Sequence, residues 1–357
     1  GQPRFMDVHT VPDSGNGAPP IVDMGAYEAF ARAIFVDQDA QGVNDGASWE
    51  DAYTDLQDGL DAAVAGDEIW VASGVYTPTQ EYAPGDPRSA TYQLENGVQI
   101  YGGFDPSAGA SGFEDRDWVL HETVLSGDLN GDDGPDFANN GENSYHVFYH
   151  PSATDLDNTA ILDGFTITGG NADVFDSNRY GGGMYNDGSS PTLANCTFDG
   201  NSATQNGGGM YNYNDSSPRL TRCSFADNLS DGTGGGIKNW ESSPALSDCT
   251  FQGNSAVWGG GMYNTDSSPT LSNCTFSGTH AAFSAGGMDN RGSSPALTNC
   301  TFSGNSSGYG GGMYNRDGSA PTLTNCILWG DSPDVIRIKE PEDTPIVTHS
   351  DVHGGYE

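Results

Sequence analysis

Six cysteines recur at an almost constant interval in the second half of the chain. Successive positions differ by 27, 26, 25, 26 and 26 residues, and the cysteines are Cys196, Cys223, Cys249, Cys274, Cys300 and Cys326. Leucine, phenylalanine, and methionine or isoleucine return with the same step. A fixed period of about 20–50 residues is typical of solenoids, in which each repeat packs on its neighbours. This period constrains the fold more than any other feature of the sequence.

Each repeat contains three short apolar clusters of two to five residues, separated by glycine, asparagine and Ser-Pro. Such clusters are too short for helices and suit strands. In "TLSNCTF", Leu271 cannot share a face with Cys274, because side chains alternate along a strand. A bend at Asn273 resolves this conflict, since asparagine tolerates the left-handed backbone conformation that a corner needs.

We therefore predict an all-β fold, a right-handed parallel β-helix with three short strands in each coil of about 26 residues and ten or more coils. Coils stacked about 4.8 Å apart place like residues in ladders. One predicted ladder consists of hydrogen-bonded amides at Asn186, Asn212, Asn239, Asn264, Asn290 and Asn315. The six cysteines form another, of free thiols, because this spacing separates their Cβ atoms too far for disulfides.

The chain divides into four regions. Residues 1–30 form an N-terminal tail, 31–168 a capping helix with irregular early coils, 169–330 six regular coils, and 331–357 a C-terminal coil or junction. Ser48 and Asp51 form a capping-box pattern, and Trp49, Leu56 and Leu60 continue as an apolar stripe. We expect this helix to cover the first coil, because the end of a β-helix exposes unpaired strand edges.

Two motifs in register, GG-x-[MI] and F-x-x-N, resemble the repeats of polymorphic outer-membrane proteins. They also resemble the large secreted β-helix proteins of planctomycetes and related bacteria, within the pectate-lyase-like superfold. The second motif stands at Phe198 to Asn201, Phe225 to Asn228, Phe251 to Asn254 and Phe302 to Asn305. Thr279 and Ala285 depart from the pattern. The resemblance covers about residues 31–330 and implies a surface location with adhesive or structural work, without implying catalysis.

The first thirty residues resemble the segment that ends such β-helix modules, although here they come first. We therefore expect a unit of a longer tandem protein, or a subunit whose tail completes its neighbour. Either arrangement stacks copies head to tail through the tail and an open C-terminal coil, a contact that does not close into a ring. The alternative is a tail that folds back along its own domain.

Charge narrows the choice of partners. The chain has 12 Lys+Arg and 49 Asp+Glu, which give a net charge of −37. This charge disfavours binding to nucleic acid, anionic lipid and polyuronate, because all three are negatively charged. No stretch of 18 apolar residues occurs, so we expect no membrane insertion. With the resemblance, this predicts a secreted bacterial protein that is extracellular or on the cell surface.

One acidic loop is a candidate calcium site. The stretch "SGDLNGDDGPDF" places five oxygen-bearing side chains within nine residues: Asp128, Asn130, Asp132, Asp133 and Asp136. Alternating carboxylate and amide oxygens suit Ca²⁺. The loop departs from the EF-hand pattern, because Asp133 replaces the glycine and Asn139 the bidentate glutamate. A polar surface turn is the alternative.

An outward-facing aromatic strip beside the glycine corner is a candidate glycan site. Its members are Tyr180, Tyr185, Tyr211, Trp258, Tyr263, Tyr309 and Tyr314, with Lys238 and Asp289 interrupting the tyrosine rungs. Aromatic rings of this kind stack on neutral sugars. The alternative is that tyrosine simply favours an exposed β surface.

Catalysis has weaker support in the sequence. Asn264-Thr265-Asp266, Asp132-Asp133 and Arg337-Ile338-Lys339 echo polygalacturonase fragments, but their order is wrong and Gly-His-Gly is missing. Lyases that act on polyuronates need basic residues, which are few here. We therefore expect a non-enzymatic structural module that repeats in a cell-surface fibre or giant surface protein. An adhesin that binds glycans or cell surfaces is the alternative, and a polysaccharide-active enzyme is a third.

Overall fold

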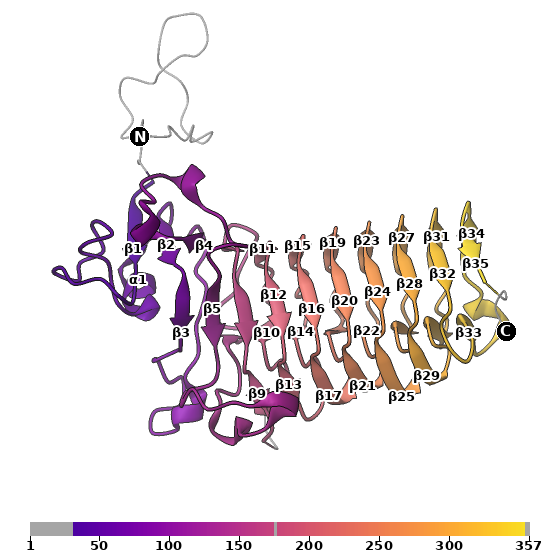
Figure 1. Cartoon of the computed structure of the whole chain (residues 1–357). Coiled ribbons are helices and arrows are strands. Elements are labelled where there is room, and N and C mark those ends of the chain that lie inside the picture. The colour runs from indigo at the N-terminus through magenta and orange to yellow at the C-terminus, as the bar shows by residue number, and fades with distance from the viewer. Residues whose placement is uncertain (1–30, 175–176, 354–357) are drawn as a thin grey trace, which may run out of the picture.

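The computed structural model describes residues 31–174 and 177–353. In this part of the chain the backbone winds into a single rod of stacked coils, which runs from the indigo to the yellow end in Figure 1. Strands of neighbouring coils pair in parallel, with like residues in register: Met184 lies opposite Met210, and Leu193 opposite Leu220. The predicted parallel β-helix is confirmed.

The strands form four sheets, which we number in the order in which one coil visits them. Sheet 1 comprises β1 (Ala33–Val36), β2 (Glu68–Ala72), β4 (Gln99–Phe104), β7 (Ile161–Asp163), β11 (Thr192–Ala194), β15 (Arg219–Thr221), β19 (Ala245–Ser247), β23 (Thr270–Ser272), β27 (Ala296–Thr298), β31 (Thr322–Thr324) and β34 (Ile346–Thr348). Sheet 2 comprises β3 (Gly74–Tyr76), β5 (Thr123–Ser126), β8 (Thr166–Thr168), β12 (Thr197–Asp199), β16 (Ser224–Ala226), β20 (Thr250–Gln252), β24 (Thr275–Ser277), β28 (Thr301–Ser303), β32 (Ile327–Trp329) and β35 (Asp351–Val352).

Sheets 3 and 4 complete the coils. Sheet 3 comprises β9 (Asn171–Ala172), β13 (Ser202–Ala203), β17 (Leu229–Thr233), β21 (Ser255–Trp258), β25 (His280–Ser284) and β29 (Ser306–Tyr309). Sheet 4 comprises β6 (Phe148–His150), β10 (Met184–Asp187), β14 (Met210–Tyr213), β18 (Ile237–Trp240), β22 (Met262–Thr265), β26 (Met288–Arg291), β30 (Met313–Arg316) and β33 (Ile336–Ile338). A regular coil therefore has four strands rather than the three expected, because the buried positions of sheet 3 hold small residues, such as Ala256 and Ala281, that give little apolar signal.

Ladders of identical side chains fill the rod. Phe198, Phe225, Phe251, Phe276 and Phe302 are buried, and their rings stack with centroids 4.4–5.0 Å apart and planes within 7°. Leucine and methionine ladders pack beside them in one continuous core. All six cysteines are buried and free, so each acts as a small apolar side chain.

Two kinds of corner follow from residue chemistry. The predicted bend lies at Asn273, which has φ of 55°, and the residues in register with it, Arg222 and Asp248 among them, are also left-handed. The glycine triplet serves another corner, where coils lie very close together. A Cβ atom on Gly260 would lie 2.2 Å from the carbonyl oxygen of His280, and one on Gly261 would lie 2.7 Å from that of Gly287. No other residue fits the second and third positions of the triplet, whereas Ala285 occupies the first position in one coil.

A ladder of buried amides runs along sheet 4. The Nδ2 atom of each asparagine donates to Oδ1 of the next at 2.9–3.0 Å, through Asn186, Asn212, Asn239, Asn264, Asn290 and Asn315. His150 lies before the first rung, with its Nδ1 2.8 Å from Oδ1 of Asn186. At the other end Nδ2 of Asn315 has no partner, because Ile338 occupies the next rung.

The helix α1 (Leu56–Ala62) lies at the β1 end of the rod (Figure 1). Its buried Leu56 and Leu60 join the core of the first coils. The helix begins later than predicted, because the backbone of Tyr53 pairs with Phe35 and is extended. Ser48 and Asp51 still bond to each other, but within a turn. None of the described helices is long and apolar enough to span a membrane.

Candidate functional site

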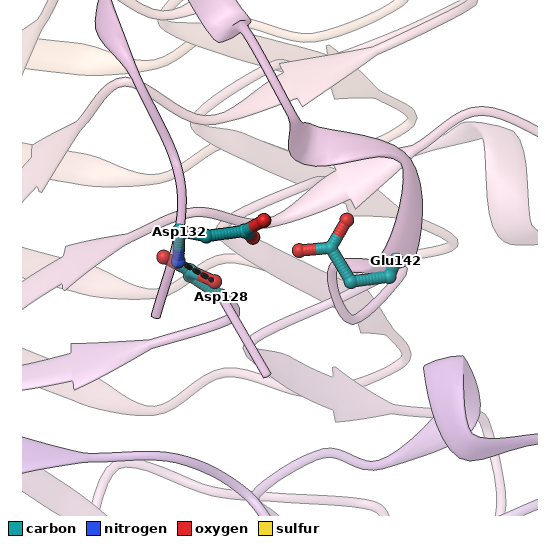
Figure 2. Close-up of side chains that lie close together, drawn as sticks. All are labelled: Asp128, Asp132 and Glu142. Carbon is teal, nitrogen blue, oxygen red and sulfur yellow. Dashed lines mark hydrogen bonds between the residues drawn. The ribbon is translucent and has the colours of Figure 1, made fainter. Parts of the chain in front are cut away.

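The predicted calcium loop forms a smaller cluster than the sequence suggested. Asp128, Asp132 and Glu142, which we call the acidic cluster, each place one carboxylate oxygen within 4.8 Å of the others (Figure 2). Asp128 also accepts backbone N–H bonds from Gly131 and Asp133, at 2.7 and 3.0 Å. Asp133 and Asp136, which were also predicted as ligands, lie outside this cluster of acidic side chains. Glu142 was missed, because a 3₁₀ turn over Asn140–Glu142 brings it back to a loop ten residues earlier.

The carboxylates of this loop repel one another and so destabilise each other's ionised form. Burial raises the pKa of Glu142, and the neighbouring Asp132 and Asp133 raise it further. Burial also raises the pKa of Asp133, although the carboxylate accepts a 2.7 Å bond from Nδ2 of Asn143. A divalent cation would relieve this repulsion, and a site built of carboxylate oxygens suits calcium or magnesium.

The tyrosines expected to form a glycan strip are covered. Tyr185, Tyr211 and Tyr263 are only 7%, 3% and 6% exposed, while Trp258 and Tyr314 are half-buried. The glycine turn before each strand of sheet 4 lies against the outward side of that strand. For example, a Cβ atom on Gly259 would lie 2.8 Å from that of Tyr263. The tyrosines therefore form a covered second layer, which differs from the exposed strip expected from the sequence.

Two charged residues break this tyrosine layer, one on each side of Tyr263. Lys238, Tyr263 and Asp289 occupy successive rungs of sheet 4. The Lys238 ammonium lies 4.2 Å from the Tyr263 ring centroid and bonds to Thr265 Oγ1. Asp289 is fully buried and accepts a 2.5 Å bond from Ser284 Oγ and a 3.2 Å bond from Arg316 Nε.

Burial controls the titration of this polar cluster. It lowers the pKa of Lys238 well below its usual value. It raises the pKa of Asp289 to about 6, although Arg316, Ser284 and Lys238 oppose the shift. Because both groups are almost completely buried, neither can touch a solute in this structure.

Exposed aromatic rings lie instead on sheet 3. Trp258 on β21, Phe283 on β25 and Tyr309 on β29 form what we call the aromatic ladder. Their ring centroids are 6.1 and 5.6 Å apart, and Phe283 and Tyr309 are 54% and 49% exposed. Since the three strands belong to successive coils, the ladder runs along the rod axis.

Phe283 is the member of this ladder that sequence reasoning missed. It stands in a shift of register between Ala281 and Ser284, where β25 is one residue longer than β21. The extra residue in "HAAFS" compared with "SAVW" was the available signal. Phe283 is also directly followed by Ser284, whose hydroxyl donates to the buried Asp289. The aromatic ladder therefore lies next to the buried polar cluster of Lys238, Asp289 and Arg316.

The family model for the right handed beta helix region matches residues 135–280 and 235–356. Together these ranges cover more than half of the chain. No curated protein matches the sequence.

Solved structures match this chain at low identity and with TM-scores below 0.5. Pectate lyase Pel9A has a TM-score of 0.43 and 14% identity, covering 90% of this chain and 78% of that one. A rhamnogalacturonan lyase has a TM-score of 0.48 and 12% identity, covering 90% and 87%. The pectin methylesterase from Aspergillus niger has a TM-score of 0.38 and 11% identity, covering 92% and 87%.

These structures correct one prediction. The sequence led us to expect a non-enzymatic chain, because polygalacturonase fragments were out of order and basic residues were few. The solved structures that resemble it are two lyases and a methylesterase, so that exclusion is wrong. At 11–14% identity they assign no reaction to this chain.

Proposed function

The chain belongs to the right-handed β-helix family, and we propose that it is an extracellular protein that binds a neutral polysaccharide along the aromatic ladder. The observation that carries this proposal is the row formed by half-buried Trp258 and exposed Phe283 and Tyr309 on three successive coils. An extended polysaccharide lying along the rod would place successive sugar rings over successive aromatic rings. Rings that offer large, rigid apolar faces suit this contact.

Charge selects the class of glycan. The net charge of −37 repels polyuronates and sulfated chains as they approach, whereas a neutral chain meets no such barrier. The likeness of the repeats to those of polymorphic outer-membrane proteins and secreted planctomycete proteins supports an extracellular or cell-surface location. The protein would then act as an adhesin for neutral glycans.

Affinity electrophoresis tests the proposal with xyloglucan, galactomannan and mixed-linkage β-glucan, and with polygalacturonate as the charged comparison. We expect retardation by at least one neutral glycan and none by polygalacturonate. A lost aromatic contact of about 0.5–1.5 kcal/mol corresponds to roughly 2- to 10-fold weaker binding for Phe283→Ala or Tyr309→Ala. Trp329→Ala is the matched control, because this ring is 53% exposed but lies on sheet 2.

Two results would contradict this function. One is that no neutral glycan binds the wild-type protein. The other is that the ladder variants bind as the wild type does while Trp329→Ala does not. Assaying the same mixtures for new reducing ends measures whether a bound glycan is cleaved.

The acidic cluster is proposed as a calcium site. Asp128 and Glu142 come from the two ends of the insertion between sheets 2 and 4, so a shared ion would tie these ends together. Oxygen donors and a flexible geometry suit calcium. The ion would stabilise the fold and is assigned no chemical step.

End-to-end assembly is a second candidate function. Among the described residues, β33, β34 and β35 pair on one side only, and Ile338, Val347 and Val352 are incompletely covered. Unpaired strand edges accept strands from other chains. The proposed donor, the tail 1–30, lies outside the described residues. Electron microscopy should show filaments for the full chain and isolated rods after deletion of 1–30, and unchanged assembly would exclude the tail as donor.

A further inference from the structure

A second amide ladder runs inside the rod, at the corner that follows sheet 2. Each asparagine there does two things. Its Oδ1 accepts from the previous coil, as when Asn254 accepts from the backbone N–H of Asn228 at 3.1 Å. Its Nδ2 donates to a backbone carbonyl of the previous coil, as when Asn254 donates to Phe225 at 2.8 Å and Asn305 to Phe276 at 3.0 Å. Each asparagine rung thus acts as both an acceptor and a donor, and Thr279 is the exception.

The last described rung is an aspartate. Oδ1 of Asp331 accepts from the backbone N–H and from Nδ2 of Asn305, both at 2.8 Å, so the acceptor half of the pattern is kept. Its Oδ2 is buried and has no partner. Asp331 follows Phe302 by the same 29 residues that separate Asn305 from Phe276. In the asparagine rungs the corresponding atom is Nδ2, which donates to the backbone carbonyl of the phenylalanine of the previous coil, and in this coil that phenylalanine is Phe302.

An ionised carboxylate has only acceptor oxygens, so Asp331 in this form cannot donate a hydrogen bond to the backbone carbonyl, which is also an acceptor. A protonated carboxyl group has an O–H that can donate, and so replaces the missing amide. We propose that Asp331 is protonated when the last coil, residues 332–353, is docked, and that losing this proton loosens the coil. This pH-sensitive closure goes beyond glycan binding and does not depend on it.

Within residues 31–174 and 177–353, no charged side chain competes for Asp331. Burial raises the pKa of Asp331 to about 6, the two bonds from Asn305 oppose the shift, and no charged side chain contributes to it. Its described neighbours are uncharged: Asn305 donates to Oδ1, and a Cβ atom on Gly312 would lie 2.6 Å from Oδ2. The nearby Asp334 faces Arg337 instead.

The direction of the pH effect follows from this shift. A carboxyl whose pKa is higher in the folded than in the unfolded chain favours folding while it is protonated. Its contribution is complete below the unfolded value of 3.8 and declines as the pH rises through 3.8 to about 6. Acid therefore tightens the last coil, and neutral pH loosens it.

Hydrogen exchange of the full chain tests this inference between pH 4 and 7.5. We expect the protection factors of β33 and β34 to fall roughly 10- to 100-fold over this range, since each pKa unit corresponds to a factor of ten. Asp331→Asn restores the amide, so its protection should stay high and independent of pH. Asp215→Asn, on an exposed turn, is the control for removal of one negative charge.

A second readout follows the proton itself. The infrared difference between wild type and Asp331→Asn should contain the carbonyl band of a protonated carboxylic acid at pH 5, which disappears by pH 7.5. Constant protection in the wild type, an unchanged pH dependence in Asp331→Asn, or the absence of this band would overturn the proposal.

Discussion

The amide ladder of sheet 4 predicts that one substitution has different consequences at two rungs. Asn264 is fully buried; its Nδ2 donates to Asn290 at 2.9 Å, and its Oδ1 accepts from Asn239 at 2.9 Å. Asn264→Leu has a similar volume but leaves one buried donor and one buried acceptor unpaired. At about 1–3 kcal/mol for each unpaired group, the free energy of unfolding should fall by about 2–6 kcal/mol.

Asn315→Leu at the end of the ladder should be far milder. This rung accepts from Asn290 at 3.0 Å, but its own Nδ2 already has no partner beside Ile338. The substitution creates one unpaired donor, on Asn290, and removes another. These changes offset each other, so the free energy of unfolding should stay within about 1 kcal/mol of that of the wild type.

Urea unfolding followed by circular dichroism, at one fixed pH, measures both variants against the wild type. The slope of the transition reports whether each variant still unfolds over the same extent of surface. The reasoning requires Asn264→Leu to lower the midpoint clearly more than Asn315→Leu does. Equal effects at both rungs, or a change below about 1 kcal/mol for Asn264→Leu, would refute the idea that paired amides stabilise the ladder.

Three further predictions follow. Phe276→Ala should lower the free energy of unfolding by about 3–5 kcal/mol in urea, whereas exposed Phe283→Ala should change it by less than about 0.5 kcal/mol; similar losses would contradict the core assignment. All six thiols should resist a thiol reagent in the native protein and react in denaturant, and three or fewer reactive groups after unfolding would indicate disulfides. Calcium should raise the melting temperature of wild type but not of Glu142→Gln in calorimetry, and an equal rise in both would remove this residue from the site.

The period of the repeat was sufficient to predict the architecture, because each coil needs the same few residues. The conflict of strand faces around Asn273 located a corner that the structure contains at the same residue. The asparagine and cysteine positions could be read as ladders, since parallel in-register stacking places each residue beside its equivalent in the next coil. In these coils the local conformational preferences of the residues agree with the path of the chain around the rod.

The remaining features depend on contacts between distant residues. Glu142 joins the acidic cluster only because a 3₁₀ turn folds back on Asp132. The predicted helix is shorter because Tyr53 pairs with Phe35, and strand pairing overrides the local helix signal. The tyrosine layer is covered by a turn whose path the sequence does not reveal, so exposure could not be inferred from alternation alone.

The most direct test of glycan binding is hydrogen exchange of the wild-type protein with and without a saturating neutral oligosaccharide, chosen from the polysaccharide that binds best. The account predicts added protection in β21, β25 and β29, centred on Trp258, Phe283 and Tyr309, and none in sheet 1. Protection confined to another face, or none at any concentration, would contradict the assignment of the aromatic ladder as the binding surface.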